Sequence, residues 1–265
     1  MAEDVLKKIY TAKARHLAEE MVREPYEEVR ARARASVSSR RGLLERLRAN
    51  AGDAIICEIK RASPSAGLIA RDFDPVAIGQ AYERAGADAI SILTESDHFL
   101  GDLAFLAQVR GVTRLPLLRK DFLTTPYQMA QSAAYGADAV LLIVAGLTDE
   151  EFRSALDEAH AYELDVLVEV HDAHDLDRAL AFGVELVGVN NRNLRTMVTD
   201  LAVSEHILPQ VPPRTFAISE SGMRDLGDVE RLRRAGARGF LIGEALMRAE
   251  DPGALIATLK HAHAR

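Results

Sequence analysis

The chain has 265 residues, 48% of them hydrophobic, which suits one large α/β domain with a sizeable core. Its net charge is −7 with both signs interspersed, which argues against binding to nucleic acid or a membrane surface. No apolar run approaches the roughly 20 residues that span a bilayer, and Lys7, Lys8 and Lys13 interrupt any signal peptide. We therefore expect a cytoplasmic protein whose single cysteine, Cys57, is buried and inert in an apolar run.

Residues 1–50 are predicted to form a helical extension before the first strand. Val5, Ile9 and Leu17 lie near helical spacing among charged residues. The arginine-rich stretch Arg30–Arg48 could instead form a nucleic-acid patch. Its leucines at helical spacing and its interrupting glutamates favour an amphipathic surface helix.

Eight short apolar runs follow, separated by helical patterns such as Pro75–Arg84, Glu150–Tyr162 and Ala173–Phe182. The runs are rich in Ile, Val and Leu and do not alternate with polar residues, which predicts parallel strands covered on both faces. The predicted strands are Ala54–Ile59, Ala89–Thr94, Pro116–Leu118, Ala139–Ile143, Val166–Val170, Leu186–Val189, Phe216–Ser219 and Gly239–Ile242.

An internal repeat supports this count of strands. The segment Ala85–Ile90 recurs as Tyr135–Val140, with weaker copies at Phe182–Val187 and Ala235–Phe240. Each copy places a glycine where a helix must end in a left-handed cap. Eight βα units predict a (β/α)8 barrel, forming a single domain over residues 1–265 with its helical extension. The alternative, a doubly wound open sheet, usually carries a glycine-rich fingerprint after its first strand, and none occurs here.

Polar residues stand at the ends of most predicted strands, where a barrel of this kind has its active site. One such residue can simply mark where a strand meets solvent, and Glu58 with Lys60 could be a plain ion pair. Two lysines and two or more glutamates on one rim are costly to bury unless they pair, so they favour lysine acids beside carboxylate bases. The strand ends are Glu58–Lys60, Arg119–Phe122, Val168–Val170, Asn190–Asn193, Ser219–Gly222 and Gly243–Glu244.

The last two strands end in small residues, Ser221, Gly222 and Gly243. Short helices at this position can offer free backbone N–H groups to an anion. The pattern predicts a phosphorylated substrate, without naming the reaction.

Two histidines, His171 and His174, have a spacing that could suit a metal ion. Without a third ligand nearby, they are predicted to be surface residues at the start of a helix. We therefore expect no metal site there.

Taken in order, these motifs resemble the indole-3-glycerol phosphate synthase family, and the resemblance runs essentially end to end. There are two departures: Ala66 replaces a lysine of many relatives, and Phe99–Asp102 reads Phe-Leu-Gly-Asp instead of the commoner Phe-Gln-Gly-Ser. Both are expected to affect loop dynamics or substrate affinity. The matching stretches are Glu58–Ser65, Ser91–Glu95, Leu118–Phe122, Leu167–His171, Gly188–Leu194, Ser219–Gly222 and Leu241–Met247.

The resemblance implies conversion of 1-(2-carboxyphenylamino)-1-deoxyribulose 5-phosphate to indole-3-glycerol phosphate, with loss of carbon dioxide and water. It implies no metal and no organic cofactor, and we expect a monomer or a weak homodimer. Lys120 resembles the principal general acid, and Lys60 a lysine that contacts substrate and can act as a second acid. Glu169 resembles the carboxylate beside the anilino nitrogen. Glu58 and Asn190 resemble groups that orient the lysines and the ribulose hydroxyls.

The remaining site residues are expected to bind substrate. Arg192 resembles an arginine near the substrate carboxylate, while Phe99 and Phe122 are predicted walls for the aromatic ring. The phosphate is expected against Ser63, Ser221, Gly222, Gly243 and the amide of Glu244.

A lysine with an ordinary pKa is fully protonated at neutral pH and donates its proton poorly. We hypothesise that crowding Lys60 near Lys120 lowers a lysine pKa and improves the match.

Two alternatives remain at this point. One is another phosphate-binding barrel such as phosphoribosylanthranilate isomerase, which uses a cysteine and an aspartate; Cys57 lies on the first strand, but its neighbours differ from the isomerase pattern. The other is a catalytically silent paralogue that only binds, against which the presence of Lys60, Lys120, Glu169 and Asn190 argues.

Overall fold

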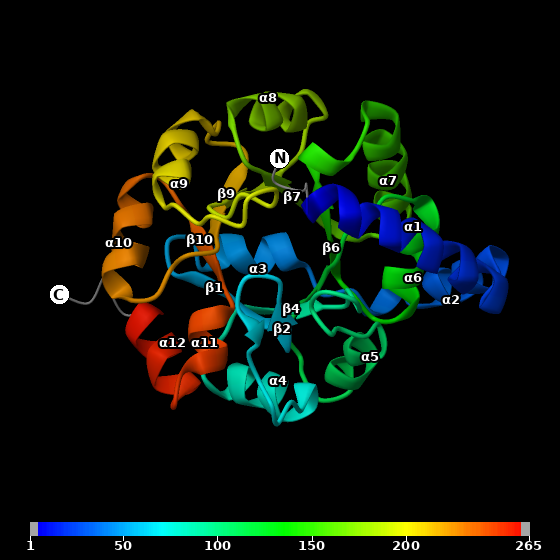
Figure 1. The fold of residues 1–265 in the computed structure, drawn as a ribbon, viewed down its shortest axis with the longest axis horizontal. Coiled ribbons are helices and arrows are strands. Elements are labelled where there is room, and N and C mark those ends of the chain that lie inside the picture. The colour runs from blue at the N-terminus through cyan, green and yellow to red at the C-terminus, as the bar shows by residue number, and fades with distance from the viewer. Residues whose placement is uncertain (1–4, 261–265) are drawn as a thin grey trace.

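The computed structural model describes residues 5–260; the two ends of the chain, 1–4 and 261–265, lie outside the described residues. Eight parallel strands close into a barrel in the order β1-β10-β9-β8-β7-β6-β5-β4 (Figure 1). The barrel closes because β1 pairs with both β10 and β4. The predicted (β/α)8 barrel with a helical extension is confirmed, and the open-sheet alternative is wrong.

The observed strands differ from the predicted ones mainly at their ends. Three strands run further than predicted, to Lys120, Asn190 and Glu220. The predicted strands end before these polar residues. In the structure these polar residues still belong to the strands, and their side chains point into the barrel. The barrel strands are β1 Ala54–Ile59, β4 Ala89–Leu93, β5 Leu117–Lys120, β6 Ala139–Ile143, β7 Asp165–Val170, β8 Leu186–Asn190, β9 Phe216–Glu220 and β10 Gly239–Ile242, and a small hairpin pairs β2 Ala62–Ser63 with β3 Gly67–Leu68.

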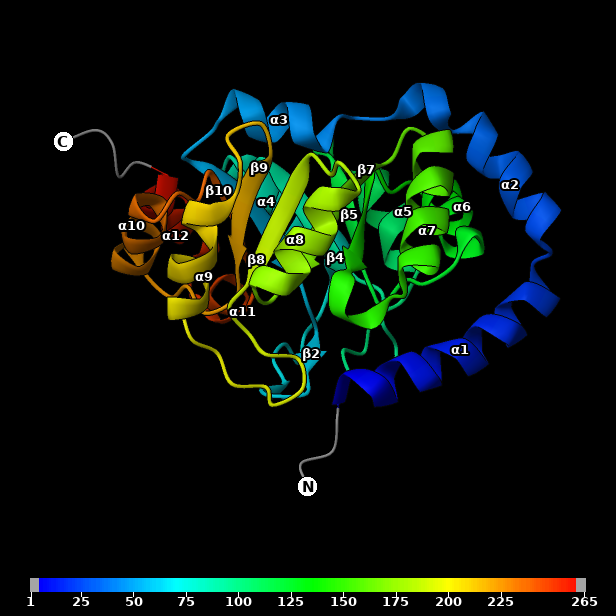
Figure 2. The same ribbon diagram turned by 90° about the horizontal axis from the view of Figure 1, so that it is seen from above.

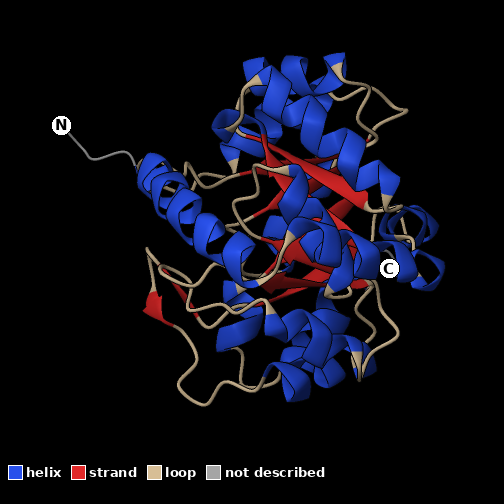
Figure 3. Ribbon diagram, turned by 90° about the vertical axis from the view of Figure 1, so that its right-hand side faces the viewer, coloured by secondary structure: helices blue, strands red, loops and turns tan. Residues whose placement is uncertain are grey.

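Helices surround the strands on the outside of the barrel (Figure 3). Their ends follow local rules: Asp74 accepts the N–H groups of Val76 and Ala77 ahead of α4, and Thr148 forms a capping box ahead of α7. Among residues 5–260, no helix is both long and apolar enough to cross a membrane. The helices after β1 are α4 Pro75–Arg84, α5 Ala104–Arg110, α6 Pro126–Ala134, α7 Asp149–Ala161, α8 Ala173–Ala181, α9 Ala202–Ile207, α10 Leu226–Arg234, α11 Glu244–Arg248 and α12 Pro252–Lys260, with short 3₁₀ turns at Val144–Gly146 and Leu208–Gln210.

The repeated glycines end their helices as predicted. Gly86, Gly136, Gly183 and Gly236 have φ angles of 84°, 90°, 73° and 112°, a region that L residues rarely adopt. Each lies just after a helix and just before a strand, so the glycine caps are confirmed.

Two apolar clusters explain why the strands read as continuous apolar runs. Ile56 packs inside the barrel, whereas Ile55 and Cys57 face the outer layer between strands and helices. Alternate residues of each strand therefore meet different apolar neighbours. Cys57 is fully buried, as predicted.

The N-terminal extension wraps the barrel from one end to the other. It comprises α1 Val5–Arg23, α2 Tyr26–Ala35, a 3₁₀ turn at Val37–Ser39 and α3 Leu43–Ala49. Helices α1 and α3 lie at opposite ends of the barrel (Figure 2).

The arginine-rich stretch Arg30–Arg48 is not one helix, so that prediction was wrong. It crosses the end of α2, the 3₁₀ turn and α3, and arginines between these helices hydrogen-bond to the barrel. Arg40 donates to the carbonyl oxygen of Ala137 at 2.9 Å, and Arg41 to that of Thr113 at 2.6 Å.

Candidate active site

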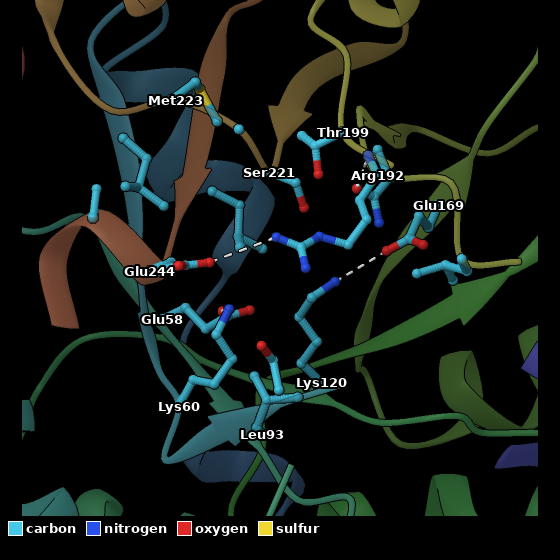
Figure 4. Close-up of a pocket in the computed structure, with 18 of the residues that line it drawn as sticks. Glu58, Lys60, Leu93, Lys120, Glu169, Arg192, Thr199, Ser221, Met223 and Glu244 are labelled. Atoms are coloured by element: carbon cyan, nitrogen blue, oxygen red, sulfur yellow. Dashed lines mark hydrogen bonds and ion pairs between the residues drawn. The ribbon is translucent and has the colours of Figure 1, made fainter. Parts of the chain in front are cut away.

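A cavity of about 860 Å³ lies at the C-terminal ends of the barrel strands. All the predicted site residues line it, and Figure 4 shows several of them converging from different strands. They converge because alternate residues of each strand point into the barrel. The predicted residues on this wall are Glu58, Lys60, Ser63, Phe99, Lys120, Phe122, Glu169, Asn190, Arg192, Ser221, Gly222, Gly243 and Glu244.

Lys120 lies between two buried carboxylates. Its Nζ donates to Glu169 Oε2 at 3.0 Å and to Glu220 Oε2 at 2.9 Å. Burial alone would lower the pKa of Lys120, but Glu169, Glu220 and Glu58 together raise it above its ordinary value. Burial likewise opposes ionisation of Glu169, but Lys120 and other neighbours lower the pKa of Glu169. The pair is therefore a lysine cation beside a carboxylate anion.

The second lysine has a carboxylate of its own. Lys60 Nζ donates to Glu58 Oε1 at 2.5 Å, and Gly243 leaves the space that the Glu58 carboxylate fills. The hypothesis of lysine crowding is wrong for Lys120, since the surrounding carboxylates raise its pKa.

Glu220 is part of this cluster, although the sequence analysis did not select it. It is fully buried, and burial raises its pKa to about 7 despite the opposing effect of Lys120. The backbone of Gly188 makes room for it, because a Cβ there would collide with Glu220 Oε1. The signal in the sequence was an acid at the end of β9, directly before the predicted phosphate residues.

The small residues after β9 and β10 form a backbone surface at the far side of the cavity. Ser221 and Gly222 have φ angles of 64° and 87°, so two consecutive residues take the left-handed conformation. Gly243 directly precedes α11. Ser63 Oγ accepts the N–H of Ala66 at 3.1 Å, which orders the loop after β1.

Arg192 spans this side of the cavity. Its guanidinium hydrogen-bonds to the Ser65 hydroxyl and lies 3.7 Å from the Glu244 carboxylate (Figure 4). Glu244 also contacts Arg248 at 3.1 Å. The two arginines hold the side chain of Glu244, which is the first residue of α11.

An apolar wall faces the charged residues. The rings of Phe99 and Phe122 lie 6.1 Å apart, and the ring of Tyr10 from α1 packs edge-on against Phe122 at 5.7 Å. Glu95 fixes this wall by accepting the N–H of Phe99 at 3.0 Å. Ile9 also lines the cavity. The sequence analysis did not select Ile9, Tyr10 or Glu95, since helical spacing does not show where α1 docks.

His171 is not the surface residue that the sequence predicted. Its side chain is 16% exposed, and its Nε2 lies 3.3 Å from Glu169 Oε1. The prediction was wrong because His171 directly follows β7, two residues after Glu169, and its imidazole turns toward that carboxylate. His174 is exposed, as expected, and forms a group of possible ligands with Asp172 and Asp175. Those two aspartates already accept backbone N–H groups at the start of α8.

Comparison with known proteins identifies the family. The family model described as indole-3-glycerol phosphate synthase matches residues 6–259. The chain belongs to the indole-3-glycerol phosphate synthase family. A relative of that name from Koribacter versatilis is 49% identical over 212 residues, covering 80% of this chain and 82% of its own. Another, from Acidithiobacillus ferrooxidans, is 43% identical over 252 residues, covering 94% and 96%.

Solved structures that resemble this member of the synthase family support its fold alone. Thiamine phosphate pyrophosphorylase from Pyrococcus furiosus aligns with a TM-score of 0.59 at 16% identity, covering 80% of this chain and 96% of its own. KGPDC from Streptococcus mutans aligns with a TM-score of 0.60 at 10% identity, covering 78% and 94%.

Cys57 does not belong to this synthase-family site. It faces the outer apolar layer and is fully buried, and burial raises the pKa of its thiol well above the ordinary value. The isomerase alternative, which depended on this residue as an acid or base, has no support in the geometry.

Proposed function

We propose that this chain converts 1-(2-carboxyphenylamino)-1-deoxyribulose 5-phosphate to indole-3-glycerol phosphate, releasing carbon dioxide and water, in tryptophan biosynthesis. Membership of the synthase family supports the reaction. The observation that carries it is Lys120, which contacts Glu169 at 3.0 Å and Glu220 at 2.9 Å at one end of a large cavity. This arrangement supplies a cationic proton donor beside two buried carboxylates at the wall of the cavity.

Lys120 is the proposed general acid of ring closure. As the aromatic carbon attacks the substrate ketone, the carbonyl oxygen becomes an alkoxide. An alkoxide is a stronger base than a lysine amine, so a lysine with a raised pKa can still protonate it while stabilising its charge. The raised pKa of Lys120 therefore suits this step better than it would suit transfer to a weak base.

Glu169 is the proposed carboxylate beside the anilino nitrogen, where it stabilises positive charge and takes part in dehydration. Its lowered pKa keeps it ionised for this role. Lys60 is the proposed second acid and substrate contact, oriented by Glu58 at 2.5 Å. Asn190 is proposed to orient the ribulose hydroxyls.

The ends of the substrate are proposed to bind on two sides of the cavity. Arg192 would hold the carboxylate, and Phe99 and Phe122 would hold the aromatic ring. The two left-handed residues after β9 and the start of α11 after β10 favour a phosphate at that side, because backbone N–H groups at such turns can bind an anion. The proposed phosphate contacts are Ser63, Ser221, Gly222, Gly243 and the amide of Glu244.

The proposed setting is the cytoplasm, with the chain acting as a monomer or a weak homodimer on a free phosphorylated small molecule. Both statements follow from the resemblance and composition, and sedimentation of the purified chain tests the second.

Turnover of the purified full chain tests the proposed function. We expect substrate to give the fluorescent product indole-3-glycerol phosphate and one carbon dioxide per product. Binding of substrate without product would contradict the proposal in favour of a silent paralogue. Turnover of phosphoribosylanthranilate in its place would contradict it in favour of an isomerase.

A further inference from the structure

The proposed function leaves His171 unused, although its imidazole faces the central carboxylate. His171 Nε2 lies 3.3 Å from Glu169 Oε1, and the Glu169 side chain is only 1% exposed. Neither of these two atoms has a hydrogen-bond partner among residues 5–260. A buried donor or acceptor without a partner is unfavourable, so two such atoms 3.3 Å apart favour a direct interaction with each other.

The other side of the imidazole faces a second carboxylate. His171 Nδ1 lies 3.8 Å from Asp175 Oδ2 of α8, and the same Oδ2 accepts the backbone N–H of His171 at 3.2 Å. Asp175 is buried, so this contact is shielded from solvent. The ring is thus held between Asp175 on its outer side and Glu169 on its inner side.

The two oxygens of Glu169 face different cations. Oε2 accepts from Lys120 at 3.0 Å, while Oε1 faces His171. Burial opposes a charged imidazole, but Asp175, Glu169 and Glu220 together raise the pKa of His171 above its ordinary value. In the same way, Lys120 and then His171 offset the burial of Glu169 and lower its pKa.

We propose that His171 is a positioning residue, a second cation that with Lys120 keeps Glu169 ionised and fixes the direction of its carboxylate. The effect on catalysis rests on the proposed function, whereas the ion pair itself does not. The titratable groups around the pair are Lys120, Glu220, Asp175 and, from α1, Tyr10.

The first experiment measures the pH dependence of kcat/KM for His171→Gln. Glutamine can keep an N–H group near the position of Nε2 but carries no charge. An opposite charge at this distance lowers a carboxyl pKa by about one to three pH units. On the acidic limb of the kcat/KM profile (its low-pH side), we expect the fall in activity to occur at a pH about one unit or more higher in the variant than in the parent. Above pH 8, the kcat/KM of the variant should be within a few fold of that of the parent.

Two further variants act as controls. His174→Gln makes the same change at an exposed histidine three residues away and should leave the limb in place. Asp175→Asn should move the limb in the same direction as His171→Gln but by less, because it weakens the charge on His171 without removing the ring. The proposal would be overturned if the acidic part of the His171→Gln profile coincided with that of the parent and only the melting temperature were lowered.

The second experiment needs no activity. Histidine-labelled full-length chain is titrated by NMR, and His171→Gln identifies the His171 signal. Coupling between two sites is reciprocal, so Glu169→Gln should lower the pKa of His171 by about as much as the kinetic limb moves. A His171 pKa that is the same in Glu169→Gln as in the parent overturns the proposal, whether or not the parent chain is active. A lowered His171 pKa in Glu169→Gln, together with a parent chain that shows no ring-closing turnover, supports the ion pair and rejects the proposed function instead.

Discussion

The two ends of the barrel both bury carboxylates beside basic side chains, but they use them differently. At the N-terminal end, Asp138 accepts the backbone N–H of Arg41 at 2.9 Å and that of Leu117 at 2.8 Å. Both of its oxygens are engaged. At the C-terminal end, Glu169 and Glu220 share the cation of Lys120, and each keeps one oxygen without a hydrogen bond within the described chain.

The difference separates Asp138, which holds backbone N–H groups in place, from Glu169 and Glu220, which share one side-chain cation at the cavity. Backbone N–H groups at the starts of strands are fixed donors, so the Asp138 carboxylate has one arrangement that satisfies them. The carboxylates at the cavity depend on side-chain cations, and burial raises the pKa of Glu220 to about 7. Such perturbed groups in a cavity are typical of functional sites.

The largest expected effect is the loss of the cation at the cavity. Lys120→Met should lower kcat by roughly 10²- to 10⁴-fold, the usual contribution of a general acid. The matched control is Lys260→Met at the other end, where Lys260 lies 2.8 Å from buried Asp88. Steady-state assays should give this control a kcat near that of the parent. An equal loss of kcat in Lys120→Met and Lys260→Met would contradict the assignment of catalysis to the C-terminal end of the barrel.

The next effect concerns stability. Asp138→Ala leaves the N–H groups of Arg41 and Leu117 and the Arg110 guanidinium without their acceptor. Removing one partner of a buried ion pair costs about 3–5 kcal/mol, and urea unfolding measures it. The folded fraction should keep its kcat, since Asp138 lies at the end away from the cavity. An Asp138→Ala variant that kept the stability of the parent but lost its kcat would contradict this prediction.

A third prediction uses the pKa of Glu220, which is raised from 4.5 to about 7 in the folded chain. The folded state then holds a proton that the unfolded state has lost, so this group lowers stability as pH rises from 4.5 to 7. The difference corresponds to at most roughly 3 kcal/mol. Glu220→Gln should therefore unfold at a higher temperature than the parent at pH 8, match it near pH 4, and lose activity. Equal melting temperatures at both pH values would show that Glu220 titrates normally.

Much of this contrast could not be read from the sequence, although the barrel could. Continuous apolar runs and the repeated glycines predict strands and helix ends, because they depend on neighbours along the chain. Asp138 precedes an apolar run and Glu220 follows one, which assigns them to opposite ends of the barrel, but the sequence does not name the partner of either. One meets backbone N–H groups and the other meets Lys120, one hundred residues away.

Site residues at strand ends could be predicted from the sequence. Residues whose place in the site depends on packing against a second element could not. Lys120 and Glu169 follow from strand position together with the resemblance. His171 was misjudged because its burial depends on Glu169 and Asp175, on two different elements. Tyr10 was missed because the path of α1 across the cavity is set by packing and not by its own periodicity.

The smallest expected effect compares one substitution at the two ends. Gly86→Ala adds a methyl group that meets no atom within 4 Å, so its only cost is the left-handed backbone at φ 84°. That conformation costs an alanine about 1–2 kcal/mol, and chemical unfolding should give this value with kcat unchanged.

Gly243→Ala is the matched variant at the cavity, where the backbone is not left-handed but the new Cβ would collide with the carboxylate of Glu58. It should disturb the Glu58–Lys60 pair and lower kcat more than stability. An equal loss of kcat in Gly86→Ala and Gly243→Ala would contradict this prediction. It would mean that the space beside Glu58 has no specific role in catalysis.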